Sequence, residues 1–532
     1  MRKRDQWLAA PLGAGLAAAL LTGCGSEDGK AAGTGESVVM GISEEVQATD
    51  PASGYDPATW LLFNNVFQSL MSFPKGSTTP QPEAAKKCGF KDDASKTYEC
   101  TLQDGLKFSN GHELTSEDVA FSFRRTLKIN DENGPAAALL SSIGDIKTPD
   151  KSTVVFHLNR PDATFPQKIA SGAGSIVDHQ EYPADRLRTD GKAVGSGVYK
   201  LESFDKNKAV FKVNGSYKGP AVVQNSGMTM KFFHGKQDEL KAAVQKGDID
   251  IAYRGLAMKD IADLESAAGD KQNVKVVEGT SAEIQHLVFN TKDTVAGKPG
   301  VRKAIAYLID RSALVRDVYK RTAEPLYSVV PSGITGHKTP FFDVYGDRPQ
   351  PDKAKAALSS AGITGKVKLT LWATPVRYGP GTVPEFQEIA KQLNASGLFD
   401  ADVKSVPFDE YEKGVRAGQY AVYAKGWVPD YPDPDNFTAP FFGQGSKELG
   451  NNYESKEISE RILPATAAEG TRSATAPDFA KLQTTIAQDV PVLPLWQGKQ
   501  YAVANSRVNG LQWTLDASTV FRFWEISKAA KG

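Results

Sequence analysis

The sequence has no surplus of charge of either sign and very few cysteines. Lys plus Arg and Asp plus Glu number 63 each among 532 residues, so nothing favours a polyphosphate partner, and nucleic-acid binding is disfavoured. Three cysteines exclude a disulfide scaffold, and 48 glycines without a repeat exclude a collagen-like chain. The hydrophobic fraction of 40% is typical of a folded soluble protein, and this length predicts about three domains.

Motifs for metal, phosphate and covalent chemistry are also missing. The six histidines show no zinc-type spacing, and the cysteines are too few to complete a zinc site. There is no G-x-x-x-x-G-K-[ST] loop and no G-x-S-x-G nucleophile elbow. The run 195–197 is too short a match for such an elbow and predicts a tight turn. We therefore expect neither an enzyme nor a bound cofactor or metal.

The first residues have the character of a targeting segment. A basic start at residues 2–4 is followed by an uncharged apolar run over 7–21. This run is shorter than the roughly 20 residues that a membrane-spanning helix needs, so we interpret it as part of a secretory signal peptide. No other stretch is apolar for long enough to predict a membrane span.

The end of this segment resembles the lipobox of bacterial lipoproteins. The matching residues are Leu21-Thr22-Gly23-Cys24. The resemblance implies that residues 1–23 are removed and that Cys24 is lipidated and becomes the new N-terminus. Residues 24–36 are rich in Gly, Ala and Ser, which predicts a flexible tether. The alternative is a plain signal peptide followed by an unmodified cysteine.

Two cysteines remain in the body of the chain, Cys88 and Cys100. Outside the cytoplasm an isolated pair is most simply a disulfide, and two free buried thiols are the alternative. The turn-rich stretch 91–96 between them suggests that the pair joins the two arms of a hairpin.

Helix and strand patterns alternate over the whole body. The β-rich run 153–158 predicts a strand. Thr115 followed by Asp118 predicts the start of a helix, since an acidic residue three positions after Thr completes a capping box. Periodic apolar residues predict further helices over 301–308, 311–318 and 385–393. This alternation favours α/β layers, and the absence of a long linker suggests packed, discontinuous domains.

The densest polar cluster is Asp430-Tyr431-Pro432-Asp433-Pro434-Asp435-Asn436. Four interpretations are open from spacing alone. They are a Pro-rich surface turn, a ligand site, a calcium loop and paired catalytic carboxylates. The cluster lacks the Gly and the terminal Glu of an EF-hand, which weakens the calcium interpretation.

Five segments in order resemble the extracytoplasmic solute-binding proteins of ABC importers, in the peptide/nickel class called family 5. They are GHELTSEDVAFSFRR (111–125), VGSGVYKLESF (194–204), HLVFNT (286–291), VRKAIAYLIDRSAL (301–314) and GWVPDYPDPDNF (426–437). The segments extend over most of the chain beyond the tether. The last of them contains the polar cluster and is similar to the family pattern G-W-x-x-D-Y-x-D-P-x-x-F.

The resemblance implies an α/β, two-lobed, hinged fold of the type II periplasmic-binding-protein kind with an additional inserted domain. Carried over, domain I comprises 37–66, 192–284 and 500–532. Domain II is 67–191 and domain III is 285–499. In such a fold the ligand lies between domains I and III, which close over it.

The function implied is a lipid-anchored receptor on the outer face of the cell membrane. It would capture short peptides and deliver them to an ABC importer permease and its ATPase, as a monomer and without catalysis. A non-peptide solute, such as an oligosaccharide, an opine or a nickel chelate, is the alternative within this fold. A secreted hydrolase that uses Asp433 and Asp435 is the alternative from another class.

The resemblance also assigns candidate ligand-binding residues. Asp430 stands where the family motif has the carboxylate that pairs with the α-ammonium of a peptide. Trp427 and Tyr431 are candidates for the walls of the site, with core packing as the alternative. Arg377 is the candidate partner of the ligand carboxylate, one position earlier than the Arg of dipeptide-binding relatives. Tyr55, in an N-terminal loop, is a further cleft candidate.

Overall fold

The computed structural model describes residues 35–54, 56–132, 134, 136–267, 273–375, 378 and 381–530. The expected signal peptide, Cys24 and most of the tether lie outside these residues, as do Tyr55 and Arg377.

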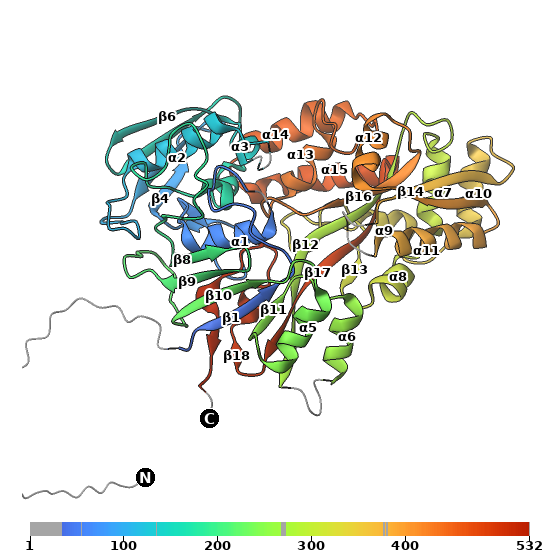
Figure 1. The fold of residues 1–532 in the computed structure, drawn as a ribbon. Coiled ribbons are helices and arrows are strands. Elements are labelled where there is room, and N and C mark those ends of the chain that lie inside the picture. The colour runs from blue at the N-terminus through green and yellow to red at the C-terminus, as the bar shows by residue number, and fades with distance from the viewer. Residues whose placement is uncertain are drawn as a thin grey trace, which may run out of the picture.

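One mixed sheet of eleven strands runs through the molecule (Figure 1), in the order β15-β14-β16-β12-β17-β11-β1-β10-β9-β8, with β13 beside β17. Its strands are β1 (Val38–Ile42), β8 (Tyr199–Asp205), β9 (Lys208–Val213), β10 (Gly227–Phe232), β11 (Ile251–Tyr253), β12 (Val274–Phe289), β13 (Ala323–Pro325), β14 (Val367–Ala373), β15 (Phe399–Ser405), β16 (Val422–Trp427) and β17 (Val492–Asn505). Strands from distant parts of the sequence are therefore neighbours.

The two longest strands, β12 and β17, join the two halves of this sheet. Their antiparallel pairing breaks between Thr280 and Ile284. On one side of the break β17 continues into β11 and β1, and on the other side β12 continues into β16 and β14. A bulge of this kind bends and twists a strand pair, so the two halves leave it in different directions.

Each half has its own hydrophobic core. The first core gathers residues such as Met40, Phe63, Phe211 and Phe523, from β1, α1 (Pro57–Val66), β9 and the C-terminal segment. The second core gathers residues such as Phe289, Ile305, Leu371 and Phe386, from β12, α7 (Pro299–Leu308), β14 and α11 (Thr382–Ala395). Two cores joined by two strands make two lobes, which agrees with the expected α/β arrangement.

A smaller sheet lies beside the first lobe. Its four strands are ordered β4-β5-β7-β6, and α2 (Ser116–Ile129) packs on β6 and β7. The strands are β4 (Ala85–Phe90), β5 (Thr97–Leu102), β6 (Ile143–Asp150) and β7 (Thr153–Leu158). Cys88 and Cys100 face each other on β4 and β5 and form a disulfide. All of this lies within the segment predicted as domain II, and the domain limits themselves stay a prediction.

Most local predictions are confirmed, with shifted ends. The strand over 153–158 is β7, and α2 begins after Thr115, whose backbone N–H donates to Asp118 at 2.8 Å. The predicted helix over 385–393 is the longer α11. The helix expected over 311–318 stops earlier: α8 (Arg311–Leu314) gives way to a π-helical turn over Val315–Tyr319, which packs against β13.

The remaining helices cover the faces and edges of the sheets. They are α3 (Ala136–Leu139), α4 (Phe165–Lys168), α5 (Gln237–Lys246), α6 (Met258–Ala267), α9 (Pro340–Tyr345), α10 (Pro351–Ser360), α12 (Phe408–Arg416), α13 (Ala439–Phe442), α14 (Leu463–Ala468) and α15 (Ala476–Asp489). Within the described ranges no helix combines the length and the apolar character that crossing a bilayer requires.

Removal of the disulfide should destabilise the smaller sheet. The bond closes a loop with a sequence separation of 12, so the chain-entropy estimate is about 3 kcal/mol. We expect Cys88→Ser/Cys100→Ser to lower the free energy of unfolding of this region by about that amount, measured by urea titration of oxidised and variant protein. Equal stability of the variant and the reduced wild type is the internal control, and an unchanged midpoint would contradict the prediction.

Candidate ligand-binding site

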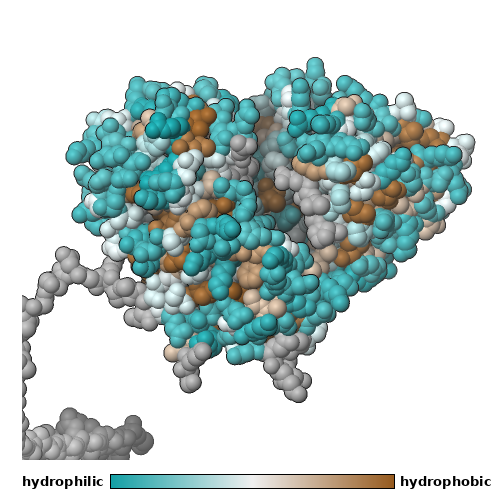
Figure 2. Space-filling view, in the orientation of Figure 1, coloured by the Kyte–Doolittle hydropathy of each residue, from teal (hydrophilic) through white to brown (hydrophobic). Residues whose placement is uncertain are grey.

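A deep groove separates the two lobes in the space-filling view (Figure 2). The polar segment 428–438 begins where β16 ends, and Trp427, the last residue of β16, pairs with Ile284 next to the register break. The candidate site therefore starts at the place where the lobes join. In such sheets ligands bind beyond the strand ends, where neighbouring strands diverge.

Asn436 holds this segment together. Its Oδ1 accepts hydrogen bonds from the indole Nε1 of Trp427 and from the backbone N of Asp430, both at 3.0 Å. Its Nδ2 donates to Oδ2 of Asp430 at 3.0 Å. Because Asn436 is only 2% exposed, one buried amide fixes the ring and the carboxylate relative to each other.

Asp430 and Trp427 are both half-buried, and Val428 between them is exposed. The Trp427 ring packs edge-on against Phe441, with centroids 5.0 Å apart. A carboxylate in this setting is oriented by the protein and still reachable from solvent. It is suited to a charge-assisted hydrogen bond with an incoming cationic group.

Tyr431 takes a different position from its neighbours. It is 5% exposed, its hydroxyl donates to Oδ2 of Asp435 at 3.0 Å, and Lys168 Nζ lies 5.6 Å from its ring centroid. Burial raises the pKa of the Tyr431 phenol and also that of the Asp435 carboxyl. Its proposed role as a wall of the ligand site stays a prediction.

Asp433 is held by an arginine. Arg472 donates from Nε and Nη2 to the two Asp433 oxygens at 2.9 and 2.7 Å, and Gln167 Nε2 approaches at 3.4 Å. Asp435 is engaged by Tyr431 as described above. Asp433 and Asp435, the two carboxylates that a hydrolase would use, thus both have partners within the protein. These contacts stabilise the loop.

The same loop contacts the smaller sheet's domain. Gln167 and Lys168 come from α4, and nearby Ala163 N donates to Ala467 O at 2.8 Å. Ser95 Oγ donates to Ala468 O at 2.7 Å. The segment that carries Asp430 is therefore held by residues of the smaller sheet's domain as well as by residues of its own lobe.

A buried polar cluster lies behind the site in the second lobe. Glu385 accepts at Oε2 from the Tyr319 hydroxyl at 3.1 Å and from Gln285 Nε2 at 3.4 Å. Glu385 is fully buried, and this burial raises the pKa of its carboxyl to about 8, although these hydrogen bonds oppose the shift. Gln285 is the residue after Ile284, which places the cluster beside the register break.

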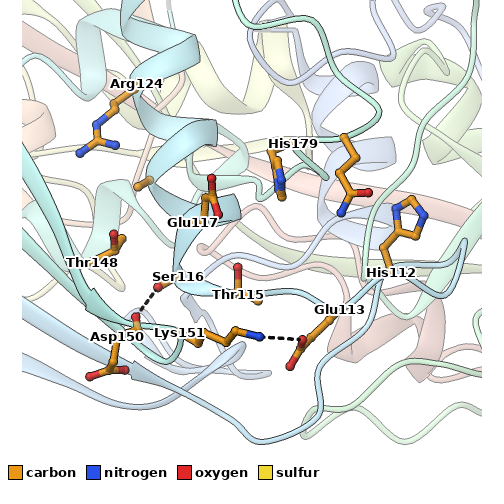
Figure 3. A pocket seen from close by; sticks show the side chains of 12 residues that line it. His112, Glu113, Thr115, Ser116, Glu117, Arg124, Thr148, Asp150, Lys151 and His179 are labelled. Carbon is orange, nitrogen blue, oxygen red and sulfur yellow. Dashed lines mark hydrogen bonds and ion pairs between the residues drawn. The ribbon is translucent and has the colours of Figure 1, made fainter.

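A separate cavity of about 530 Å³ lies in the smaller sheet's domain (Figure 3). His112 and His179 line it, and their Nδ1 atoms lie 2.7 Å from Asp178 and Asp118. Asp118, Asp178 and His179 could together surround an ion. However, both oxygens of Asp118 already accept hydrogen bonds, from Thr115 at the start of α2 and from His179, so its position is explained without an ion.

Comparison with known proteins identifies the class. Residues 79–448 match the family described as bacterial extracellular solute-binding proteins, family 5 Middle. This match covers more than half of the chain, and the protein belongs to that family of ABC-importer solute-binding proteins.

Two relatives in Escherichia coli (strain K12) are named for dipeptides. The probable D,D-dipeptide-binding periplasmic protein DdpA is 26% identical over 505 residues, covering 92% of this chain and 94% of its own. The dipeptide-binding protein is 27% identical over 445 residues, covering 78% and 80%. A relative in Haemophilus influenzae, 24% identical over 84% of each chain, is named heme-binding protein A.

The fold has close counterparts among solved structures. HbpA2 from Haemophilus parasuis superposes with a TM-score of 0.80 at 21% identity, covering 93% of this chain and all of that one. The two-lobed, hinged α/β fold is thus that of the periplasmic binding proteins.

Sequence reasoning did not assign a role to several residues that shape the site. Asn436 lies within the segment 426–437. A polar side chain directly before the apolar Phe437 was the one sequence feature that could have suggested a structural role for it. Gln167 and Arg472 are far from the motif in sequence, and Glu385 lies inside a predicted helix. No local pattern marks these three.

Replacement of Asn436 should weaken the whole segment. In Asn436→Ala the indole N–H of Trp427 and the backbone N–H of Asp430, both half-buried, lose their acceptor, which costs at most about 1–3 kcal/mol for each group. We expect a lower thermal midpoint and altered Trp fluorescence. Val428→Ala, at an exposed position of the same segment, is the control and should change neither.

The stability contributed at Glu385 should depend on pH. The folded-state pKa of about 8 exceeds that of an unfolded Glu, about 4.3. Proton retention therefore stabilises the fold fully below pH 4.3, and this contribution is lost as pH rises toward 8. We expect Glu385→Gln to become more stable than wild type as pH rises over that range, measured by urea unfolding. Glu324→Gln, exposed in the same lobe, should show no such trend.

Proposed function

We propose that the protein captures short peptides in the groove between its lobes and delivers them to an ABC importer permease. The observation that carries the proposal is the half-buried Asp430 carboxylate, which Asn436 holds beside Trp427 where β16 ends at the junction of the lobes. Relatives named for dipeptides support the choice of ligand.

The binding mode follows from the chemistry of a peptide. An extended ligand can pair its backbone with the protein irrespective of side-chain identity. Asp430 then receives the α-ammonium, and a charge-assisted hydrogen bond of this kind contributes about 1.5–3 kcal/mol. Arg377 is the proposed partner of the ligand carboxylate, and Tyr55 and Tyr431 are further proposed contacts.

Closure would couple binding to transport. The break in the β12–β17 pairing is a place where the lobes can rotate with few hydrogen bonds disturbed. A ligand that touches both lobes only in the closed form shifts the equilibrium toward that form, which the permease would recognise. The permease's ATPase would supply the transport energy, so no catalysis is assigned to this chain.

The remaining parts of the proposal concern location and assembly. Lipidation of Cys24 would hold the monomer on the outer face of the cell membrane, with 24–36 as its tether. Neither a cofactor nor a metal is part of the proposal. The proposed domains are domain I (37–66, 192–284 and 500–532), domain II (67–191) and domain III (285–499).

The identity of the ligand is tested by mass spectrometry of the molecules released when purified protein is denatured. A heterogeneous set of short peptides supports the proposal. A single sugar, opine, heme or metal chelate contradicts it.

Asp430→Asn should weaken peptide binding about 10- to 100-fold, because it removes the charge and keeps an oxygen for the Asn436 hydrogen bond. Calorimetric titration with tripeptides measures the loss. The same peptides with an acetylated N-terminus are the control, since they should bind wild type and variant equally weakly. Equal affinity of the two proteins for free tripeptides would remove Asp430 from the site.

A further inference from the structure

Glu283 occupies the register break between β12 and β17. Its side chain lies over β17: a methyl group added to Gly498 would be 3.7 Å from Glu283 Oε2 and 3.5 Å from the Trp496 ring. Glu283 is half-buried, and its neighbour Ile284 pairs with Trp427 at the start of the segment that carries Asp430. This carboxylate therefore lies at the junction of the lobes, close to the proposed site.

The first lobe presents an ion pair to the same region. Glu44 follows β1 and Arg254 follows β11, two parallel neighbours that end together. Arg254 Nε donates to Glu44 Oε2 at 3.0 Å. Burial raises the pKa of the Glu283 carboxyl, while the charge of Arg254 lowers it and that of Glu44 raises it.

Glu283 lacks a partner of its own. Across the described residues its carboxylate forms no hydrogen bond and no ion pair within 4 Å, whereas Glu44 and Arg254 neutralise each other. When Glu283 is ionised, the trio of Glu44, Arg254 and Glu283 therefore carries one negative charge that no ion pair compensates among the described residues. A partly desolvated carboxylate is costly unless a cation arrives.

Polar oxygen atoms also lie in the second lobe, in the buried cluster of Glu385 and Gln285 beside the register break. Among the residues that the structure describes, Glu385 Oε1 and Gln285 Oε1 have no hydrogen-bond partner, and both side chains are fully buried. The Trp496 ring is 4.7 Å from that of Tyr319, whose hydroxyl binds Glu385. The Trp496 ring also lies near Glu283 beside Gly498, and the face of an aromatic ring attracts a cation.

We propose that Glu283 binds the ammonium or guanidinium group of a ligand side chain, so that the receptor prefers peptides containing lysine or arginine. The proposal rests on the proposed function: Asp430 takes the α-ammonium, and Glu283 takes a second positive charge. One residue of an extended peptide advances about 3.3 Å, so a long basic side chain close to the N-terminus can extend toward the hinge.

The test compares peptides that differ only in the charge of one side chain. Lys-Ala-Ala, Ala-Lys-Ala and Ala-Ala-Lys are each titrated by calorimetry beside the matching norleucine peptide. We expect wild type to prefer lysine at least 10-fold at one position. In Glu283→Gln the preference at that position should fall below 3-fold, with the norleucine affinity unchanged. Glu410→Gln, at an exposed position of α12, should retain the wild-type preference.

The outcomes separate the two proposals. If lysine and norleucine peptides bind wild type equally at every position, the Glu283 proposal is overturned and peptide capture stands. If no tripeptide binds wild type, peptide capture fails and the Glu283 proposal fails with it. A lysine preference that survives intact in Glu283→Gln also overturns the assignment. The comparison of lysine and norleucine peptides uses wild-type protein alone. It therefore still tests the proposal if Glu283→Gln folds poorly.

Discussion

The pairing of β12 with β17 is the constraint on which the remaining structure depends. These strands are the longest in the sheet, and they take part in both hydrophobic cores. Their register breaks between Thr280 and Ile284, where Gln497 donates from Nε2 to Ser281 O at 2.7 Å and so keeps the strands together. A short break within a continuous ladder lets rigid lobes change their relative orientation without unfolding either core.

The polar segment after β16 links this junction to recognition. Its own amide, Asn436, orients Trp427 and Asp430, and Arg472 and Gln167 hold Asp433 from two sides. The charge of Asp433 is compensated by Arg472, whereas Glu283 at the junction forms no ion pair among the described residues. A compensated carboxylate stiffens a site, and the uncompensated Glu283 is the group that we propose makes the site prefer a cation.

Local sequence patterns predicted much of the secondary structure and little of its assembly. The Thr115–Asp118 capping box and the β-rich run 153–158 depend on residues a few positions apart, and both are confirmed. The helix expected beyond Leu314 changes to a π-helical turn in contact with β13, a tertiary neighbour that local propensity does not specify. The segment 426–437 pointed to the candidate site, but not to the Arg472 and Gln167 contacts.

By itself the sequence determined the class of protein, since five ordered segments and missing catalytic motifs are properties of the chain. Only the tertiary structure decided which carboxylates are compensated. Arg472, 39 residues away in the sequence, binds Asp433, and strand pairings between distant segments bring the charges of Glu44 and Arg254 to act on Glu283. The free energy of a buried charge depends on the neighbours that folding brings within a few ångströms, and sequence spacing does not specify them.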